Sequence, residues 1–148
     1  MKLVIIYAPE ERDVAAAFFA HLRSLRDLAI TTQSFCTTDP ALADHLPSAD
    51  IVLPLLSIPL VTWWVTSGPS CATSPSWCDR ARIVPVLVRT CIWRTVFAGA
   101  AFGNLALPRS GKWIAEGDAD ALMAECVGEL RAIVAGLRSE RLARRASR

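Results

Sequence analysis

The stretch Ile51-Val-Leu-Pro-Leu-Leu56, which ends at Ser57, is a continuous apolar run with no polar residue between its members. Strands without polar alternation are usually covered on both faces, as the central strands of parallel sheets are. Residues 3–6 and 83–88 form similar runs, and residues 29–35 alternate weakly. Because the segments between them have helical patterns, the sequence predicts an open, mostly parallel α/β sheet.

Two segments have the apolar spacing of amphipathic helices. The first follows Asp13, which can cap a helix, and its apolar positions are Val14, Phe18, Leu22 and Leu25. The second is a long helix from Asp118, with a buried stripe at Leu122, Cys126, Leu130, Ile133, Val134 and Leu137. A short helix is expected at 41–45, and Trp113-Ile114 is the candidate for a last short strand.

The composition of the 148 residues, 53% hydrophobic and 20% charged, is that of one globular domain. The net charge of +2 says little about partners, but five arginines crowd the last eleven residues: Arg138, Arg141, Arg144, Arg145 and Arg148. We interpret them as a solvated helix end whose cations suit the helix dipole; contact with nucleic acid, which we do not expect, or with an acidic partner is the alternative. We therefore divide the chain into a domain at 1–137 and a basic helix end or tail at 138–148.

The sequence gives no sign of export or of membrane insertion. A secretory signal is not evident after Lys2, and the apolar run 51–66 is too short for a membrane span and contains two prolines. We therefore expect a cytoplasmic protein. Five cysteines are an odd number, which favours reduced thiols, and no cysteine or histidine has metal-ligand spacing, so we expect no metal site.

Four segments resemble, in their order, those of a known family: Val4–Asp13, Ser48–Ser57, Arg82–Trp93 and Leu105–Lys112. The first has a tyrosine before a polar turn, and the third contains the Pro, Arg, Cys and Trp of the family's fourth strand. They are similar to the bacterial TIR (Toll/interleukin-1 receptor) domains. The resemblance implies a flavodoxin-like fold, with about five parallel strands between helices. In such sheets ligands lie beyond the carboxyl ends of the strands.

TIR domains are either assembly modules or enzymes that cleave the bond between nicotinamide and ribose in NAD. The enzymes carry a glutamate about a dozen residues beyond the serine that closes the central strand, where a carboxylate can stabilise an oxocarbenium-like species. Thirteen residues beyond Ser57 lies Ser70, and no glutamate occurs between Arg12 and Ala115. The chain is therefore degenerate at the catalytic position.

From these observations we expect a TIR-like signalling or antiphage-defence module that acts by protein–protein association without catalysis and without a cofactor. Its partners would be other TIR-like or signalling domains, self-association included. One alternative is an NAD glycohydrolase with a relocated carboxylate, at Asp79, Glu10 or Glu11. Another is a nucleotide-binding sensor without turnover, with NAD as a ligand. For Glu10 and Glu11 we favour solvated charge in an exposed turn.

The candidate site residues fall into two groups. The ligand-binding candidates are Tyr7, Arg12 and Ser57, although a strand-end serine commonly bonds to local backbone. The interface candidates are Cys36, Asp39, Pro40, Trp63 and Trp64. Because adjacent side chains on a helix point about 100° apart, we expect at most one of the two tryptophans to lie fully in the core.

Overall fold

The computed structural model describes residues 1–67, 80–97 and 106–148. The strands are β1 (Lys2–Tyr7), β2 (Thr31–Cys36), β3 (Ile51–Leu56), β4 (Arg82–Ile83) and β5 (Val86–Leu87). The α-helices are α1 (Arg12–Leu22), α2 (Leu42–His45), α3 (Ile58–Thr66) and α5 (Ala119–Ala146). Short 3-10 helices are η1 (Pro9–Glu11), η2 (Arg23–Leu28), η3 (Leu46–Ser48) and η4 (Ile114–Glu116). Within the described residues, no helix is long and apolar enough to cross a membrane.

All the paired strands run parallel, in the order β2-β1-β3-β4, and β5 also pairs with β3. The central strand β3 therefore has β1 on one side and both β4 and β5 on the other. This arrangement confirms the predicted α/β class: a parallel sheet of about five strands flanked by helices, consistent with a flavodoxin-like fold.

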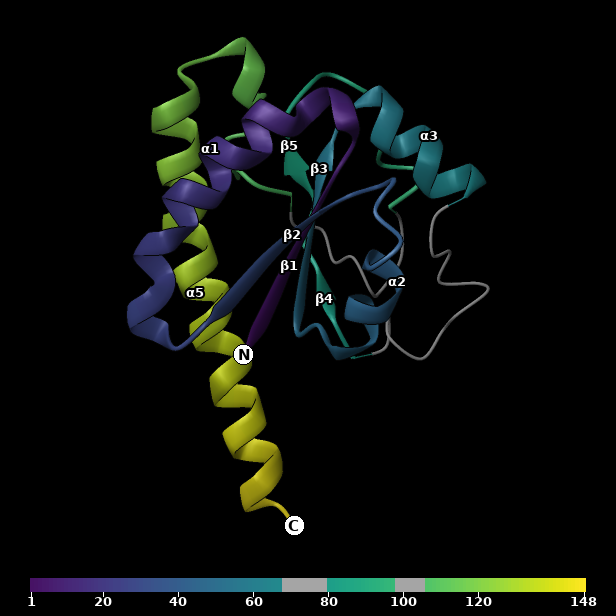
Figure 1. Cartoon of the computed structure of the whole chain (residues 1–148). Coiled ribbons are helices and arrows are strands. Elements are labelled where there is room, and N and C mark those ends of the chain that lie inside the picture. Colours follow the sequence, from purple (N-terminus) through teal and green to yellow (C-terminus); the bar gives the residue numbers. More distant parts are fainter. Residues whose placement is uncertain (68–79, 98–105) are drawn as a thin grey trace.

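Helices cover both faces of the sheet (Figure 1). Leu3 and Ile5 of β1 pack into a core with α1 and α5, whereas Val4 and Ile6 pack into a second core with α2 and α3. The side chains of β3 divide between the same two cores, and all six of its residues are buried. A strand with no polar alternation is stable here because neither of its faces meets water.

The predicted fourth strand, 83–88, is interrupted. It forms β4 and β5, with Pro85 between them, and proline has no N–H to donate to a neighbouring strand. Leu107 supports this region from the other side: its N–H donates to the Pro85 carbonyl, and its own carbonyl accepts from the Leu87 N–H at 2.7 Å.

Two local expectations are wrong. Trp113 and Ile114 do not form a strand, because Ile114 begins the single turn η4. Asp13 does not cap α1, because the helix begins at Arg12 and places Asp13 inside its first turn, with Glu11 at the capping position.

The long helix α5 begins as expected, since the Asp118 side chain accepts a hydrogen bond from the Ala121 N–H at 3.2 Å. Its predicted stripe is buried, except that Ile133 and Leu137 are half-buried at its edge. Every residue from 139 to 148 is exposed. The last turns of α5 therefore extend beyond the sheet (Figure 1), about 12 Å of helix at 1.5 Å per residue.

Candidate functional site

The carboxyl ends of β1 and β3 mark the point where this sheet favours a ligand. The two strands are neighbours, but the chain leaves β1 toward α1 on one face and leaves β3 toward α3 on the other. In open parallel sheets a crevice opens where the connections diverge in this way. The residues that follow the two strands here are 7–12 and Ser57.

Glu11 is the titratable side chain buried at this point. Its side chain is 2% exposed, while Glu10 is exposed. The expectation of solvated charge is therefore wrong for Glu11. In the turn η1 the Glu11 N–H donates to the Ala8 carbonyl at 2.9 Å, and Glu11, unlike Glu10, has a charged partner that reaches it.

Arg89, just beyond β5, is the partner of Glu11. Its Nε lies 2.6 Å from Glu11 Oε1, and its N–H donates to the Leu56 carbonyl at 3.0 Å. Because β3 lies between β1 and β5, the ion pair spans the carboxyl end of β3. Within the described ranges Glu11 Oε2 has no hydrogen-bond partner, although it is buried. Such an atom costs about 1–3 kcal/mol, and more when it is charged.

The predicted ligand-binding residues have simpler roles in this arrangement. Ser57 is fully buried and caps α3, its Oγ accepting from the Leu60 N–H at 3.4 Å. Tyr7 ends β1 half-buried, and Arg12 is exposed in the first turn of α1. The fold thus brings Tyr7 and Ser57 to the ends of neighbouring strands, but the hydroxyl of Ser57 is engaged with its own helix.

The two tryptophans of α3 lie as expected, with one in the core. Trp64 is 4% exposed and packs on Phe97 with ring centroids 4.7 Å apart. Trp63 is half-buried and meets Trp64 edge-on at 6.2 Å. Of this pair, Trp63 is the one that an approaching molecule could contact.

The outward face of α3 carries no charge. Ile58, Thr62 and Val65 lie at i, i+4 and i+7 and are all exposed, Ile58 by 65% and Val65 by 63%. No residue of α3 is acidic or basic. A solvent-facing helix stripe is normally charged or polar, so this face is suited to contact with another molecule.

The end of β2 and the loop after it hold the other predicted interface residues. Cys36 is buried, with Sγ 3.2 Å from Thr38 Oγ1. Asp39 is half-buried and its Oδ1 accepts from the Ala41 N–H at 2.9 Å, which stabilises the turn. The Cys36 and Asp39 side chains therefore make local contacts, and Pro40, like Thr38, is exposed.

A pocket of about 320 Å³ lies beyond β5, lined by Cys91, Ile92, Trp93 and Trp113 among others. Ile92 is 82% exposed, and Arg94 lies 5.6 Å from the ring of Trp93. Burial raises the pKa of the Cys91 thiol, which disfavours the thiolate that nucleophilic chemistry needs. The pocket is therefore a surface for apolar contact rather than a nucleophilic site.

Sequence reasoning missed Arg89 as a site residue, as well as the apolar Ile92. Nothing in the local sequence distinguishes Glu11 from Glu10, because the selection depends on Arg89, which is far away in the chain. Two positions considered for a carboxylate, Ser70 and Asp79, lie outside the described residues. In the part of the chain that is described, no group of three or more His, Cys, Asp or Glu side chains could hold a metal ion.

Comparison of the chain with protein-family models, with curated proteins and with solved structures finds no match in any of the three.

Proposed function

We propose that the domain acts by protein–protein association, as a TIR-like signalling or defence module, with α3 as its main contact surface. The outward stripe of Ile58, Thr62 and Val65 is the observation that supports this proposal. The centres of protein interfaces are depleted of charge. A second copy of the chain suits the stripe, because two uncharged faces can meet without like-charge repulsion.

The size of α3 sets the strength of this association. Nine residues make a helix about 13 Å long, and one face of so short a helix is too small to bury by itself the roughly 800 Å² per partner of a stable complex. Contacts from Trp63 and Ile92 at the same edge of the sheet would enlarge the surface. We therefore expect weak association, with a Kd of about micromolar or weaker, which local concentration of several copies would strengthen.

Cross-linking through the outward stripe tests the proposal. Thr62→Cys places a thiol at the centre of the stripe, and Ala135→Cys places one on the exposed side of α5 as a matched control. Under mild oxidation, Thr62→Cys should give a covalent dimer well above the background of the native cysteines, and Ala135→Cys should not. Equal cross-linking of the two variants and of the wild type would contradict an α3 contact.

A second candidate function, NAD cleavage, is favoured by one specific observation: Glu11 is a buried carboxylate near the carboxyl ends of the neighbouring strands β1 and β3. A carboxylate there could stabilise the oxocarbenium-like transition state or hold the ribose hydroxyls. With 2% exposure, however, Glu11 cannot touch a substrate until the contact with Arg89 opens. For this reason we place association first.

Nicotinamide release from NAD distinguishes the two functions. The purified protein is assayed at high concentration with crowding agent, next to Glu11→Gln and the neighbouring control Glu10→Gln. If Glu11 is catalytic, release is lost in Glu11→Gln and kept in Glu10→Gln. Absence of release from the wild type under all these conditions would rule out the enzymatic candidate and leave the association proposal unaffected.

A further inference from the structure

The strand β2 forms one edge of the sheet. In the order β2-β1-β3-β4 it pairs with β1 on one side, and its outer side faces no other strand among the described residues. The described helices lie to either side of β2, over the faces of the sheet, and none of them crosses this edge (Figure 1). An edge of this kind presents unpaired backbone N–H and C=O groups to any chain that approaches it.

The direction of the unpaired groups follows from the hydrogen bonds of β2 to its neighbour. The N–H groups of Thr31 and Thr37 donate to carbonyls of the chain along β1, at 3.0 and 2.9 Å. Backbone groups alternate in direction along a strand, so those of Thr32 and Ser34 point away from β1. Within the described ranges, neither of these two residues has a backbone partner on its outer side.

The strand lacks the features by which natural edge strands avoid pairing with another chain. Those features are charged side chains (lysine above all), prolines and bulges. The sequence Thr31–Cys36 contains no charged residue and no proline, and its register with β1 is continuous over all its residues. Thr31 and Ser34 are exposed. The edge is therefore open to the addition of another strand.

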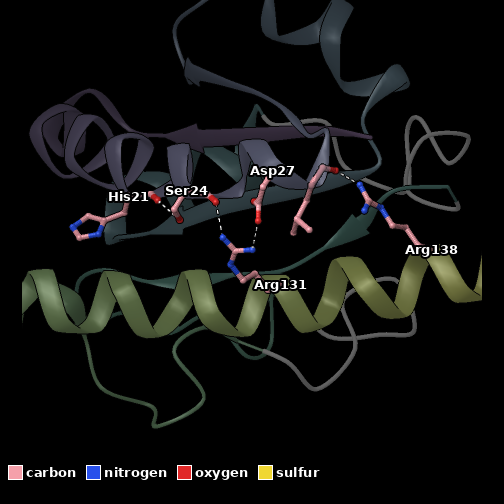
Figure 2. A network of polar contacts seen from close by, with 6 residues as sticks. His21, Ser24, Asp27, Arg131 and Arg138 are labelled. Atoms are coloured by element: carbon pink, nitrogen blue, oxygen red, sulfur yellow. Dashed lines mark hydrogen bonds and ion pairs between the residues drawn. The ribbon is translucent and has the colours of Figure 1, made fainter.

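Both ends of β2 are held in place by the rest of the domain. Figure 2 shows the start: Arg131 and Arg138 of α5 contact Asp27 and the Leu28 carbonyl of η2, the segment that leads into the strand. At the other end Phe35 is 8% exposed and packs into the core with α2. A strand that is already held in its extended form loses less entropy when another strand pairs with it.

We propose that β2 pairs antiparallel with β2 of a second copy of the chain, around a two-fold axis at Gln33. Thr32 of each copy then lies opposite Ser34 of the other, and each such pair exchanges two hydrogen bonds. The same edge is thus self-complementary, and without charges it meets its copy without repulsion. A register centred on Ser34 would instead use the Cys36 carbonyl, which already accepts from the Asp39 N–H at 2.9 Å.

Gln33 is a second observation in favour of this register. Its side chain is half-buried, and its Oε1 is buried without a hydrogen-bond partner in the described part of the chain. At the two-fold axis the side chains of the two copies project from the same face, with Cβ atoms about 4.5–5.5 Å apart. Rotation of the amide exchanges Oε1 and Nε2. Each amide can then donate to the other, and the second copy supplies the donor that a single chain lacks.

This contact goes beyond the function proposed for α3 and does not depend on it. In the sheet β1 separates β2 from β3, the strand that leads into α3. A few backbone hydrogen bonds contribute little net free energy against the freedom lost on association. We therefore expect a Kd of about millimolar, weaker than that of the α3 contact, and the pairing gains strength where several copies are held together.

Disulfide trapping at high protein concentration tests the register. Gln33→Cys places two thiols opposite each other, with Cα atoms about 4.5 Å apart, a separation that a disulfide spans. The matched control is Ser34→Cys, at a more exposed residue of the same edge. Its two copies are offset along the strands by more than the reach of a disulfide, about 7 Å. Under mild oxidation Gln33→Cys should give at least about fivefold more covalent dimer than Ser34→Cys.

Both cysteine variants are made in the Ile58→Glu/Val65→Glu background, which removes the apolar stripe of α3. Failure of this proposal is then distinguished from failure of association through α3. Amide hydrogen exchange of the same background with a native β2 is a second measurement. Exchange at Thr32 and Ser34 should slow about twofold when the protein concentration reaches the Kd.

Three results would overturn the proposal. Equal cross-linking of the two cysteine variants, or more in Ser34→Cys, would mean random collision or another register. Exchange at Thr32 and Ser34 that is fast at every concentration would mean that no second copy pairs with the edge. Exchange that is already slow in dilute protein would mean that another segment of the same chain covers it.

Discussion

Glu11 and Arg89 form an ion pair between a buried and an exposed side chain. The Glu11 side chain is 2% exposed, and that of Arg89 is 55% exposed. The carboxylate has lost its hydration, so it depends on Arg89 for compensation, whereas Arg89 keeps contact with solvent. The two partners should therefore respond differently to mutation.

We predict that Arg89→Ala destabilises the domain by about 1–3 kcal/mol, because it leaves a buried carboxylate without its charged partner. Urea unfolding followed by circular dichroism measures this change. The double variant Arg89→Ala/Glu11→Gln should recover part of the loss, because a neutral amide is less costly to bury than a charge. If the double variant is as unstable as the sum of the two single variants, the pair has no energetic coupling and the interpretation is wrong.

Among the elements, β1, β3 and α5 could be predicted from the sequence because their burial is continuous or periodic along the chain. The six apolar residues of β3 are sufficient to indicate a strand covered on both faces. The break at Pro85 could also have been expected, since proline cannot donate to a neighbouring strand.

The features that the sequence did not reveal depend on contacts between distant residues. Glu11 is buried because Arg89 reaches it across the end of β3, and neither residue has a local pattern that shows this. Trp113-Ile114 is apolar like a strand, but its chain turns into η4 before α5. The absence of charge in α3 can be read from the sequence. The exposure of Ile58 and Val65 cannot, because it depends on how the helix is oriented against the core.

Two acidic residues fasten α5 to the rest of the domain, and both have a lowered pKa. The hydrogen bond from Arg131 is the main cause for Asp27. For Asp50, burial alone would raise the pKa, but the hydrogen bonds from Arg141 and from the Lys2 N–H lower it by more. A carboxyl group whose pKa is lower in the folded state than in the unfolded chain stabilises the fold at pH values above its unfolded-state pKa. This stabilisation is lost as the pH falls through its folded-state pKa.

We therefore predict that the free energy of unfolding decreases as the pH is lowered from about 5 to about 2. Urea titrations at a series of pH values measure it. Asp50→Asn should be less stable than the wild type at neutral pH, and the two curves should approach each other in acid. Glu129, whose pKa is raised by burial, is present in both proteins, so the difference between the curves isolates Asp50. A constant difference at all pH values would contradict the role given to Asp50.

In the whole molecule, two kinds of surface lie at opposite ends of the sheet. The carboxyl edge presents the uncharged stripe of α3, together with the exposed Ile92. The amino edge lies beside the projecting part of α5 (Figure 1), whose Arg141 and Arg144 line a surface pocket. Salt screens the attraction between exposed arginines and a charged partner, whereas an apolar contact involves no charges to screen. The two surfaces can therefore be studied separately in one protein by changing the ionic strength.

Association through α3 is the central claim, and sedimentation equilibrium over a concentration series tests it most directly. The wild type is compared with Ile58→Glu/Val65→Glu, which places two charges in the outward stripe. The control is Leu142→Glu, which changes an equally exposed residue, 67%, at the far end of α5. We predict reversible association of the wild type and of the control, weakened at least about tenfold in the double variant. A wild type that stays monomeric up to millimolar concentration, or a double variant that associates as strongly as the wild type, would contradict the account.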